Sequence, residues 1–149
     1  MEAHEYNVDI NWNHDRKGIM CSPELIRDES VCIEVATPPE FPKGMPGIWS
    51  PEHLFTASVS SCLMTTFLAI AENSRLEFKN FKCQSKGKLA QVDGRFQMTE
   101  IILQPTVTIG NEKDREHAEK VLQKSEKACL ISNSIKSKVT MITRIQLAE

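Results

Sequence analysis

The chain has 149 residues and a formal net charge of −2, from 18 Lys and Arg against 20 Asp and Glu. Hydrophobic residues make up 40% and charged residues 26%, which is ordinary for a globular protein and argues against a disordered or low-complexity chain. There is no basic excess of the kind that binds a phosphate backbone, so we expect no nucleic-acid partner.

The first third of the chain predicts a small antiparallel meander. Residues 6–12 alternate between apolar and polar side chains, which indicates a half-buried strand. Residues 13–18 predict a turn closed by Gly18, a second strand begins at Ile19, and residues 30–36 alternate again. The apolar side chains of the first strand are Tyr6, Val8, Ile10 and Trp12.

A proline-rich loop, residues 37–50, leads into a long helix. Loops of this length often bind ligands, and its apolar residues could line a substrate entrance or cap a dimer core. Ser50, Pro51 and Glu52 are typical of a helix start, with a capping Ser and a Pro at the first helical position. The uncharged stretch 54–71 is near the length of a membrane span. Because a third of it is Ser or Thr, we expect a buried helix and no membrane partner. The apolar loop residues are Phe41, Met45, Ile48 and Trp49.

The second half predicts a hairpin, a helix and a last strand. Residues 78–91 and 95–109 are predicted to form two strands joined by a turn at Asp93 and Gly94. We expect a bulge near 99–100, because the alternation of apolar and polar residues shifts there. An amphipathic helix over 112–128 and a strand over 138–147 follow. The order βββ-α-ββ-α-β predicts an α+β fold with mostly antiparallel sheet, in one domain over residues 1–149. The inward stripe of the second helix is Ala118, Leu122, Ser125 and Cys129.

The cysteines predict a reducing, cytoplasmic setting. Their number is odd, they form no CxxC pair, and the N-terminus lacks the apolar segment of a secretory signal. We therefore expect neither a secreted disulfide framework nor a structural zinc site, and in this setting a paired cysteine favours catalysis over a structural role. The five positions are Cys21, Cys32, Cys62, Cys83 and Cys129. Those in predicted strands, Cys21, Cys32 and Cys83, are expected to be packing residues.

Cys62 and Cys129 lie on the two predicted helices. Deep in a helix, Cys62 gains nothing from the helix N-terminus. On local sequence alone it reads as an inert apolar residue unless another element delivers a cation. Packing of the two helices in one core could bring it to Cys129. His53 precedes Cys62 by about 13 Å along the helix, so Cys–His hydrolase chemistry is a poor fit.

Two motifs resemble those of the OsmC/Ohr proteins, the osmotically inducible and organic-hydroperoxide-resistance families. Residues 50–63, SPEHLFTASVSSCL, resemble the helix written NPEELLAAALAACL, and residues 128–135, ACLISNSI, resemble the motif A-x-x-x-C-P-[IV]-S. The turn 15–18 resembles the arginine-bearing hairpin turn of the same family. The sequence departs from the pattern at Leu130, where the family usually has proline, and this could alter how Cys129 is presented.

The resemblance implies a thiol-dependent peroxidase that reduces organic hydroperoxides. Matched by motif, Cys62 attacks the peroxide and Cys129 resolves the product as a Cys62–Cys129 disulfide. Arg16 matches the arginine that stabilises the thiolate, and Glu52 the glutamate that holds this arginine. Without the resemblance, Arg16 reads as a solvated turn residue and Glu52 as an acid that complements the helix dipole. No bound cofactor or metal is implied, and an external dithiol supplies the electrons.

Spacing adds an expectation of a homodimer. Glu52 and Cys62 are separated by about 15 Å on one helix, so one arginine cannot easily serve both within a chain. Two antiparallel copies of the helix would bring Glu52 of one close to Cys62 of the other, and the intertwined homodimer of the family agrees. The alternative function is a non-catalytic module of the same fold that binds a hydrophobic ligand or senses oxidants.

Overall fold

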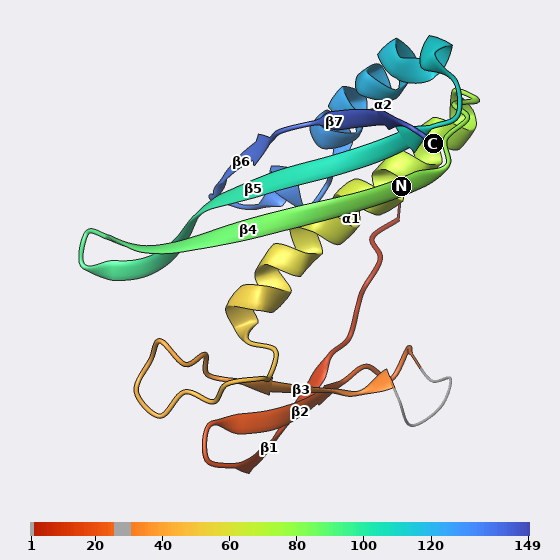
Figure 1. The fold of residues 1–149 in the computed structure, drawn as a ribbon. Helices are drawn as coiled ribbons and strands as arrows, with labels where there is room; N and C mark the ends of the chain where they lie inside the picture. Colours follow the sequence, from red (N-terminus) through yellow and green to blue (C-terminus); the bar gives the residue numbers. More distant parts are fainter. Residues whose placement is uncertain (1, 26–30) are drawn as a thin grey trace. The chain divides into compact units, whose positions relative to one another are not determined.

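The computed structural model describes residues 2–25 and 31–149, and the chain forms two compact units (Figure 1). The first unit is Met1–Leu54 and the second is Phe55–Glu149. Helix α1, Pro51–Asn73, begins in the first unit and continues into the second.

The first unit contains the predicted meander. Strands β1 (Asp9–His14), β2 (Lys17–Cys21) and β3 (Ile33–Ala36) pair antiparallel in the order β1-β2-β3. The third strand was expected over 30–36. It begins at residue 33, and residue 30 lies outside the described part of the chain.

The turn between β1 and β2 is tighter than expected. It consists of Asp15 and Arg16, and Asp15 takes the left-handed conformation with φ 49°. Gly18 does not close the turn but is buried inside β2, where a Cβ atom would approach the Asn11 carbonyl oxygen to 2.6 Å. A larger residue at this position would therefore push the two strands apart.

The apolar face of the first strand is not half-buried, and this expectation is wrong for the single chain. All six residues of β1 are exposed. The alternation is real, but nothing in the described part of the chain covers the face that it creates. The apolar side chains on this face are 60 to 85% exposed, namely Tyr6, Val8, Ile10 and Trp12. An apolar strand face of this kind is a candidate contact surface.

The proline-rich loop is held against β3, and it ends at the predicted helix start. The Ala36 N–H donates to the Trp49 carbonyl at 2.9 Å, so the end of the loop follows the edge of the strand. Ser50 caps α1, since its Oγ accepts the His53 backbone N–H at 3.2 Å. The His53 Nδ1 lies 2.7 Å from the same Oγ. The helix begins at the predicted residue because this cap, and the Pro that follows it, fix its first turn.

The second unit is built on a long hairpin of β4 (Asn80–Val92) and β5 (Arg95–Ile109). Its turn is at Asp93 and Gly94 as predicted, with φ 51° and 77°. The predicted bulge is also confirmed: Lys88 pairs with Glu100 and Leu89 pairs with Met98, which leaves Thr99 as the extra residue.

The C-terminal strand differs from the expectation over 138–147. It is interrupted at 142–143 into β6 (Lys138–Met141) and β7 (Arg144–Leu147), and both segments pair parallel with β5. The sheet is therefore mixed. The connection from β5 passes through α2, and such a crossover returns the chain in the same direction.

The second helix starts later than expected over 112–128. Glu112–Asp114 form a 3₁₀ turn capped by the Asn111 side chain, and α2 proper spans Arg115–Ala128. A second 3₁₀ turn, Ser132–Ser134, follows it. The expected inward stripe of α2, which Cys129 continues, is buried.

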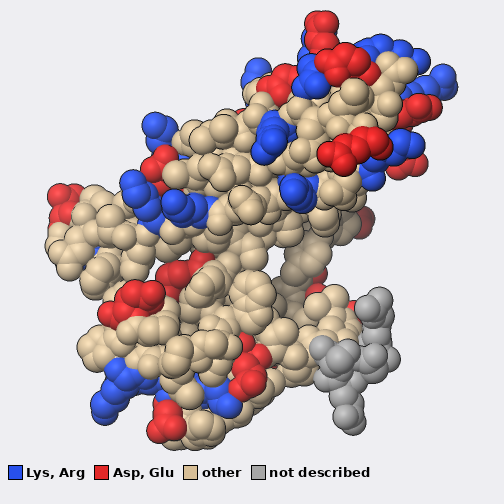
Figure 2. All heavy atoms as spheres, in the orientation of Figure 1, with Lys and Arg blue, Asp and Glu red and all other residues tan. Residues whose placement is uncertain are grey.

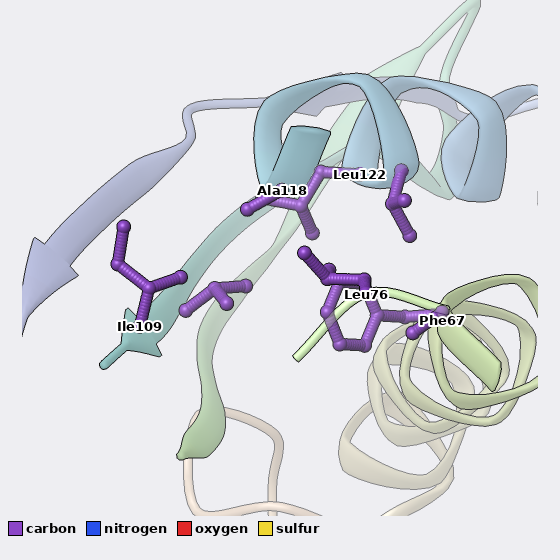
Figure 3. Packing of buried hydrophobic residues seen from close by; sticks show 8 residues of the cluster. Phe67, Leu76, Ile109, Ala118 and Leu122 are labelled. Carbon is purple, nitrogen blue, oxygen red and sulfur yellow. The ribbon is translucent and has the colours of Figure 1, made fainter. Parts of the chain in front are cut away.

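Both helices pack on one face of the second unit's sheet (Figure 1). Alternate residues of β5 point to them and are fully buried, from Ile101 to Ile109. Phe67 of α1 and Leu122 of α2 meet above this row, together with Leu76 (Figure 3). A Cβ atom at Gly87 of β4 would collide with the Thr56 side chain, so this glycine allows α1 to lie close to the sheet.

The outer face of the sheet is polar. Exposed and part-buried residues alternate along β4, and its lysines are on the exposed side. Figure 2 shows basic side chains spread over this sheet. This is the pattern of a sheet with one face on the core and the other face in water. The exposed lysines of β4 are Lys82, Lys86 and Lys88.

Helix α1 is a core helix, although by length and composition alone it is apolar enough to cross a membrane. One of its faces is fully buried against the sheet, so the prediction of a buried helix is confirmed for this face alone. Beside this face lie Met64 and Leu68, which are 39% and 41% exposed. The buried residues of α1 are Val59, Leu63, Phe67 and Ala71.

Candidate active site

The structure brings the side chains of Cys62 and Cys129 together within the second unit. Cys62 lies in the middle of α1 and is half-buried, while Cys129 ends α2 and is 1% exposed. Both are free thiols. They meet because both helices pack on the same face of the sheet and because Cys129 continues the inward stripe of α2.

The two sulfur atoms have different environments. Burial raises the pKa of Cys62, but hydrogen bonds to its sulfur outweigh burial, so its pKa lies below the ordinary value of a cysteine. The hydrogen bond from the Cys129 thiol lowers the pKa most. Smaller contributions come from the backbone N–H of Ile131, the Thr66 hydroxyl and the backbone N–H of Leu130. Hydrogen bonds to the charged form of a group favour that form.

Cys129 shows the opposite behaviour. Burial raises its pKa, and the hydrogen bond with Cys62 raises it further because Cys129 must keep its proton to donate. The backbone N–H of Ser132 acts in the other direction without reversing the shift. Within the pair, Cys62 therefore loses its proton more readily than Cys129. This division of roles suits a nucleophile and a resolving partner.

The sequence alone suggested that Cys62 needs a cation from another element. The structure places hydrogen-bonding groups around its sulfur. The Thr66 hydroxyl lies 3.9 Å from the sulfur, one turn further along α1. The N–H groups of Leu130 and Ile131 come from the segment after α2, where the extended backbone of Cys129 (φ −65°, ψ 108°) ends the helix. Consecutive backbone N–H groups of this kind form an anion-binding concavity.

Leu130 contributes through its backbone. Its side chain is 67% exposed, whereas its N–H faces Cys62. A proline at this position, as in the motif that the sequence resembles, would have no N–H to donate. The departure from the motif therefore adds a hydrogen-bond donor to the site.

Arg16 and Glu52 lie in the first unit. Arg16 is exposed in the turn between β1 and β2, and its carbonyl accepts the Thr37 N–H at 3.1 Å. Glu52 is half-buried in the first turn of α1. Their expected roles toward the thiolate stay predictions.

The expectation that Cys21 and Cys32 are packing residues is wrong. They form a disulfide, with Cα atoms 4.5 Å apart. Cys21 ends β2 and Cys32 immediately precedes β3, so the two strands bring them face to face. Cys83 does pack as expected, against the core cluster that contains Leu63.

Sequence reasoning missed four hydrogen-bonding groups of this site, those of Thr66, Leu130, Ile131 and Ser132. Thr66 could have been found, because it is four residues after Cys62 and side chains at that spacing are neighbours on a helix. The backbone N–H groups left no such signal, since their direction depends on how the chain leaves α2.

The comparisons with known proteins agree with this architecture. The family model described as OsmC-like protein matches residues 44–144. The uncharacterized protein YmaD of Bacillus subtilis is 26% identical over 146 residues, which cover 95% of this chain and 93% of YmaD.

Two solved structures show the same fold. An OsmC-like protein of unknown function from Vibrio cholerae has a TM-score of 0.83 at 21% identity, covering 95% of this chain and 99% of the other. An organic hydroperoxide resistance protein OsmC from Legionella pneumophila has a TM-score of 0.74 at 18% identity, covering 98% and 99%. Since the family model spans well over half of its length, this chain belongs to the OsmC-like protein family.

Proposed function

We propose that the protein is a thiol-dependent peroxidase that reduces organic hydroperoxides to alcohols. The observation that carries the proposal is the hydrogen-bonded pair of Cys62 and Cys129, in which the pKa of the first is lowered and that of the second is raised. A name that describes organic hydroperoxide resistance, carried by a protein of the same fold, supports the choice of substrate class.

The reaction has three steps. The Cys62 thiolate attacks the distal oxygen of ROOH, the O–O bond breaks, and the products are the Cys62 sulfenic acid and, after protonation, ROH. The Cys129 thiol then displaces the sulfenic oxygen as water and forms the Cys62–Cys129 disulfide. An external dithiol reduces this disulfide and is itself oxidised to a disulfide, which closes the cycle.

The first unit offers apolar surface for an organic substrate. A surface hollow of about 330 Å³ is lined by the end of the loop and the start of α1. Its lining includes Ile48, Trp49 and His53, and the Trp49 and His53 rings meet edge to face with centroids 6.1 Å apart. This hollow is a candidate binding surface for the organic part of a hydroperoxide.

The active form in this proposal is a homodimer in the cytoplasm, and the two units of each chain act as one domain. Two apolar surfaces support the dimer: the exposed face of β1 and the exposed side of α1 at Met64 and Leu68. Their burial against a second copy would remove apolar area from water. Light scattering after size exclusion should give close to twice the chain mass. A stable monomer at micromolar concentration contradicts this part of the proposal.

The experiment that tests the function is a turnover assay with cumene hydroperoxide and a dithiol. Many equivalents of alcohol per protein support the peroxidase. The alternative function is a module of the same fold that senses oxidants, and it would stop after one equivalent. The same assay with hydrogen peroxide tests the substrate class, and an equal or faster rate argues against organic substrates.

A further inference from the structure

We propose that Cys21 and Cys32 form a second redox site, a reversible disulfide that exchanges with low-molecular-weight thiols independently of Cys62 and Cys129. The first observation is its geometry. In the β2–β3 ladder Met20 pairs with Ile33, so the next pair along the two strands is Cys21 and Cys32. Their Cα separation of 4.5 Å is that of directly opposed residues in a non-hydrogen-bonded antiparallel pair.

The second observation is that β2 and β3 are held together by further contacts next to the disulfide. Strands β2 and β3 pair over Lys17–Met20 and Ile33–Ala36, next to the disulfide. The Lys17 Nζ lies 2.5 Å from a Glu34 carboxylate oxygen, which adds an ion pair across the same two strands. The reduced thiols would therefore remain close to each other in the folded protein, which makes reformation of the bond an intramolecular step.

The third observation is access. Cys32 is exposed, whereas Cys21 is half-buried at the end of β2. Thiol–disulfide exchange requires a thiolate to reach one sulfur of the bond, and access is one of the factors that set its rate. The incoming thiolate therefore attacks the Cys32 sulfur, and Cys21 is the leaving group.

The exchange balances with thiols alone. The thiolate of one glutathione attacks Cys32, the Cys21–Cys32 bond breaks, and Cys21 departs as a thiolate that takes up a proton. A second glutathione attacks the mixed disulfide at the glutathione sulfur, which releases the Cys32 thiol and oxidised glutathione. Two electrons pass from two thiols to the protein, and oxidised glutathione reverses the sequence.

The expected cellular setting favours reversibility. In reducing compartments, disulfides of most organisms are transient and serve catalysis or redox sensing. Buried structural disulfides resist reduction by the glutathione pool, whereas exposed ones exchange with it. For an exposed disulfide in a cytoplasmic protein, we therefore expect the oxidised fraction to depend on the ratio of reduced to oxidised thiols around it.

The test is a titration of the native protein in buffers of reduced and oxidised glutathione. After acid quenching and alkylation, peptide mass spectrometry reports the oxidation state of each cysteine, and circular dichroism follows the fold. We expect Cys21 and Cys32 to pass together from oxidised to reduced while the spectrum stays unchanged. The proposal is overturned if the pair stays oxidised in excess reduced glutathione, or if reduction removes the β-sheet signal.

Single variants test the assigned direction of attack. With oxidised glutathione, Cys21→Ser leaves Cys32 to be modified and Cys32→Ser leaves Cys21. We expect the mixed disulfide to form at least about threefold faster in Cys21→Ser, because access controls exchange. Equal or reversed rates overturn the assignment.

A Cys62→Ser control separates this site from the peroxidase. This variant should show the same Cys21–Cys32 titration as the wild type, whether or not the protein reduces peroxides. A titration that disappears in Cys62→Ser would mean that the pair has no independent exchange.

Discussion

The two cysteine pairs of this chain reach their close approach by different means. Cys21 and Cys32 are opposite each other across two antiparallel strands and form a disulfide with an exposed partner. Cys62 and Cys129 come from two helices on one face of a sheet and remain thiols joined by a hydrogen bond. Strand register explains the first pair, while the packing of a whole core is needed for the second.

The reactivity of a sulfur toward peroxide depends on its surroundings. Only a thiolate attacks efficiently, so the surroundings must stabilise negative charge on sulfur. Around Cys62, one hydroxyl, one thiol and two backbone N–H groups do this. A sulfur held in a disulfide is not a thiolate, so we expect the first pair to exchange with thiols and the second to react with peroxide.

The largest expected effect comes from Cys62→Ser. If peroxide chemistry belongs to the helical pair alone, turnover with cumene hydroperoxide falls by at least about 10³-fold, the order seen when a nucleophile is removed. The strand pair is intact in this variant, so residual turnover above the uncatalysed rate would show that the two pairs share the chemistry. Cys83→Ser is the matched control and should keep wild-type turnover, since Cys83 is a packing residue.

The second largest effect is expected for Cys129→Ser. Multiple turnover stops, because the sulfenic acid on Cys62 has lost its resolving thiol. The first round remains, since a serine hydroxyl can still donate a hydrogen bond to the Cys62 sulfur. Stopped-flow measurement should give one alcohol per chain, and mass spectrometry should find the trapped sulfenic acid. Loss of the first round as well would reverse the assigned roles of the two cysteines.

Most of the fold could be predicted because local signals and tertiary packing agree. The start of α1 follows from Ser50 and Pro51, and the hairpin turn follows from Asp93 and Gly94. The interruption of the last strand could not be predicted, because residues 138–147 alternate well enough for one strand. The exposure of β1 had no local signal either, since alternation predicts an apolar face but not what covers it.

The site could be predicted only in part. The motif resemblance pointed to Cys62 and Cys129, and the structure brings them together. The source of the lowered pKa of Cys62 was sought in a charged side chain, whereas the structure supplies hydrogen bonds, half of them from the backbone. The Cys21–Cys32 disulfide does not follow from the number and spacing of the cysteines, because it depends on the strand register that sets these two residues opposite each other.

A smaller effect is expected for Arg16→Ala, which tests whether a cation adds to these hydrogen bonds. An opposite charge close to an ionisable group shifts its pKa by about one to three units. Loss of Arg16 should therefore raise the pKa of Cys62 and lower its alkylation rate at neutral pH about tenfold. Arg16→Lys should restore the rate only partly, because a point charge cannot hold Glu52 in two-point contact.

Lys17→Ala is the matched control for Arg16→Ala. Lys17 is the next residue, and its charge is already paired with Glu34, so the pH profile of Cys62 alkylation should stay that of the wild type. Circular dichroism confirms folding in each variant. Coincident profiles for Arg16→Ala and the wild type would identify Arg16 as an ordinary turn residue.

The smallest effect is expected for Leu130→Pro, which removes one backbone donor from Cys62. Proline has no N–H, and the extended backbone of Cys129, with ψ 108°, is the conformation that a residue before proline prefers. The N–H of Ile131 remains. A thiolate forms by loss of a proton, so losing a donor raises the pKa of Cys62 and leaves less thiolate at any pH below it. One hydrogen bond contributes about 1 kcal/mol, which corresponds to about fivefold.

The pH dependence of Cys62 alkylation separates the role of this N–H from that of the exposed leucine side chain. In Leu130→Pro the profile should move to higher pH, so that alkylation below the pKa slows while the plateau at high pH is unchanged. In Leu130→Ala the N–H is kept and the profile should match the wild type. If both variants move together, the side chain acts on the site. If neither moves, the Cys129 thiol, Thr66 and Ile131 account for the thiolate without Leu130, and the departure from proline has no effect on the pKa of Cys62.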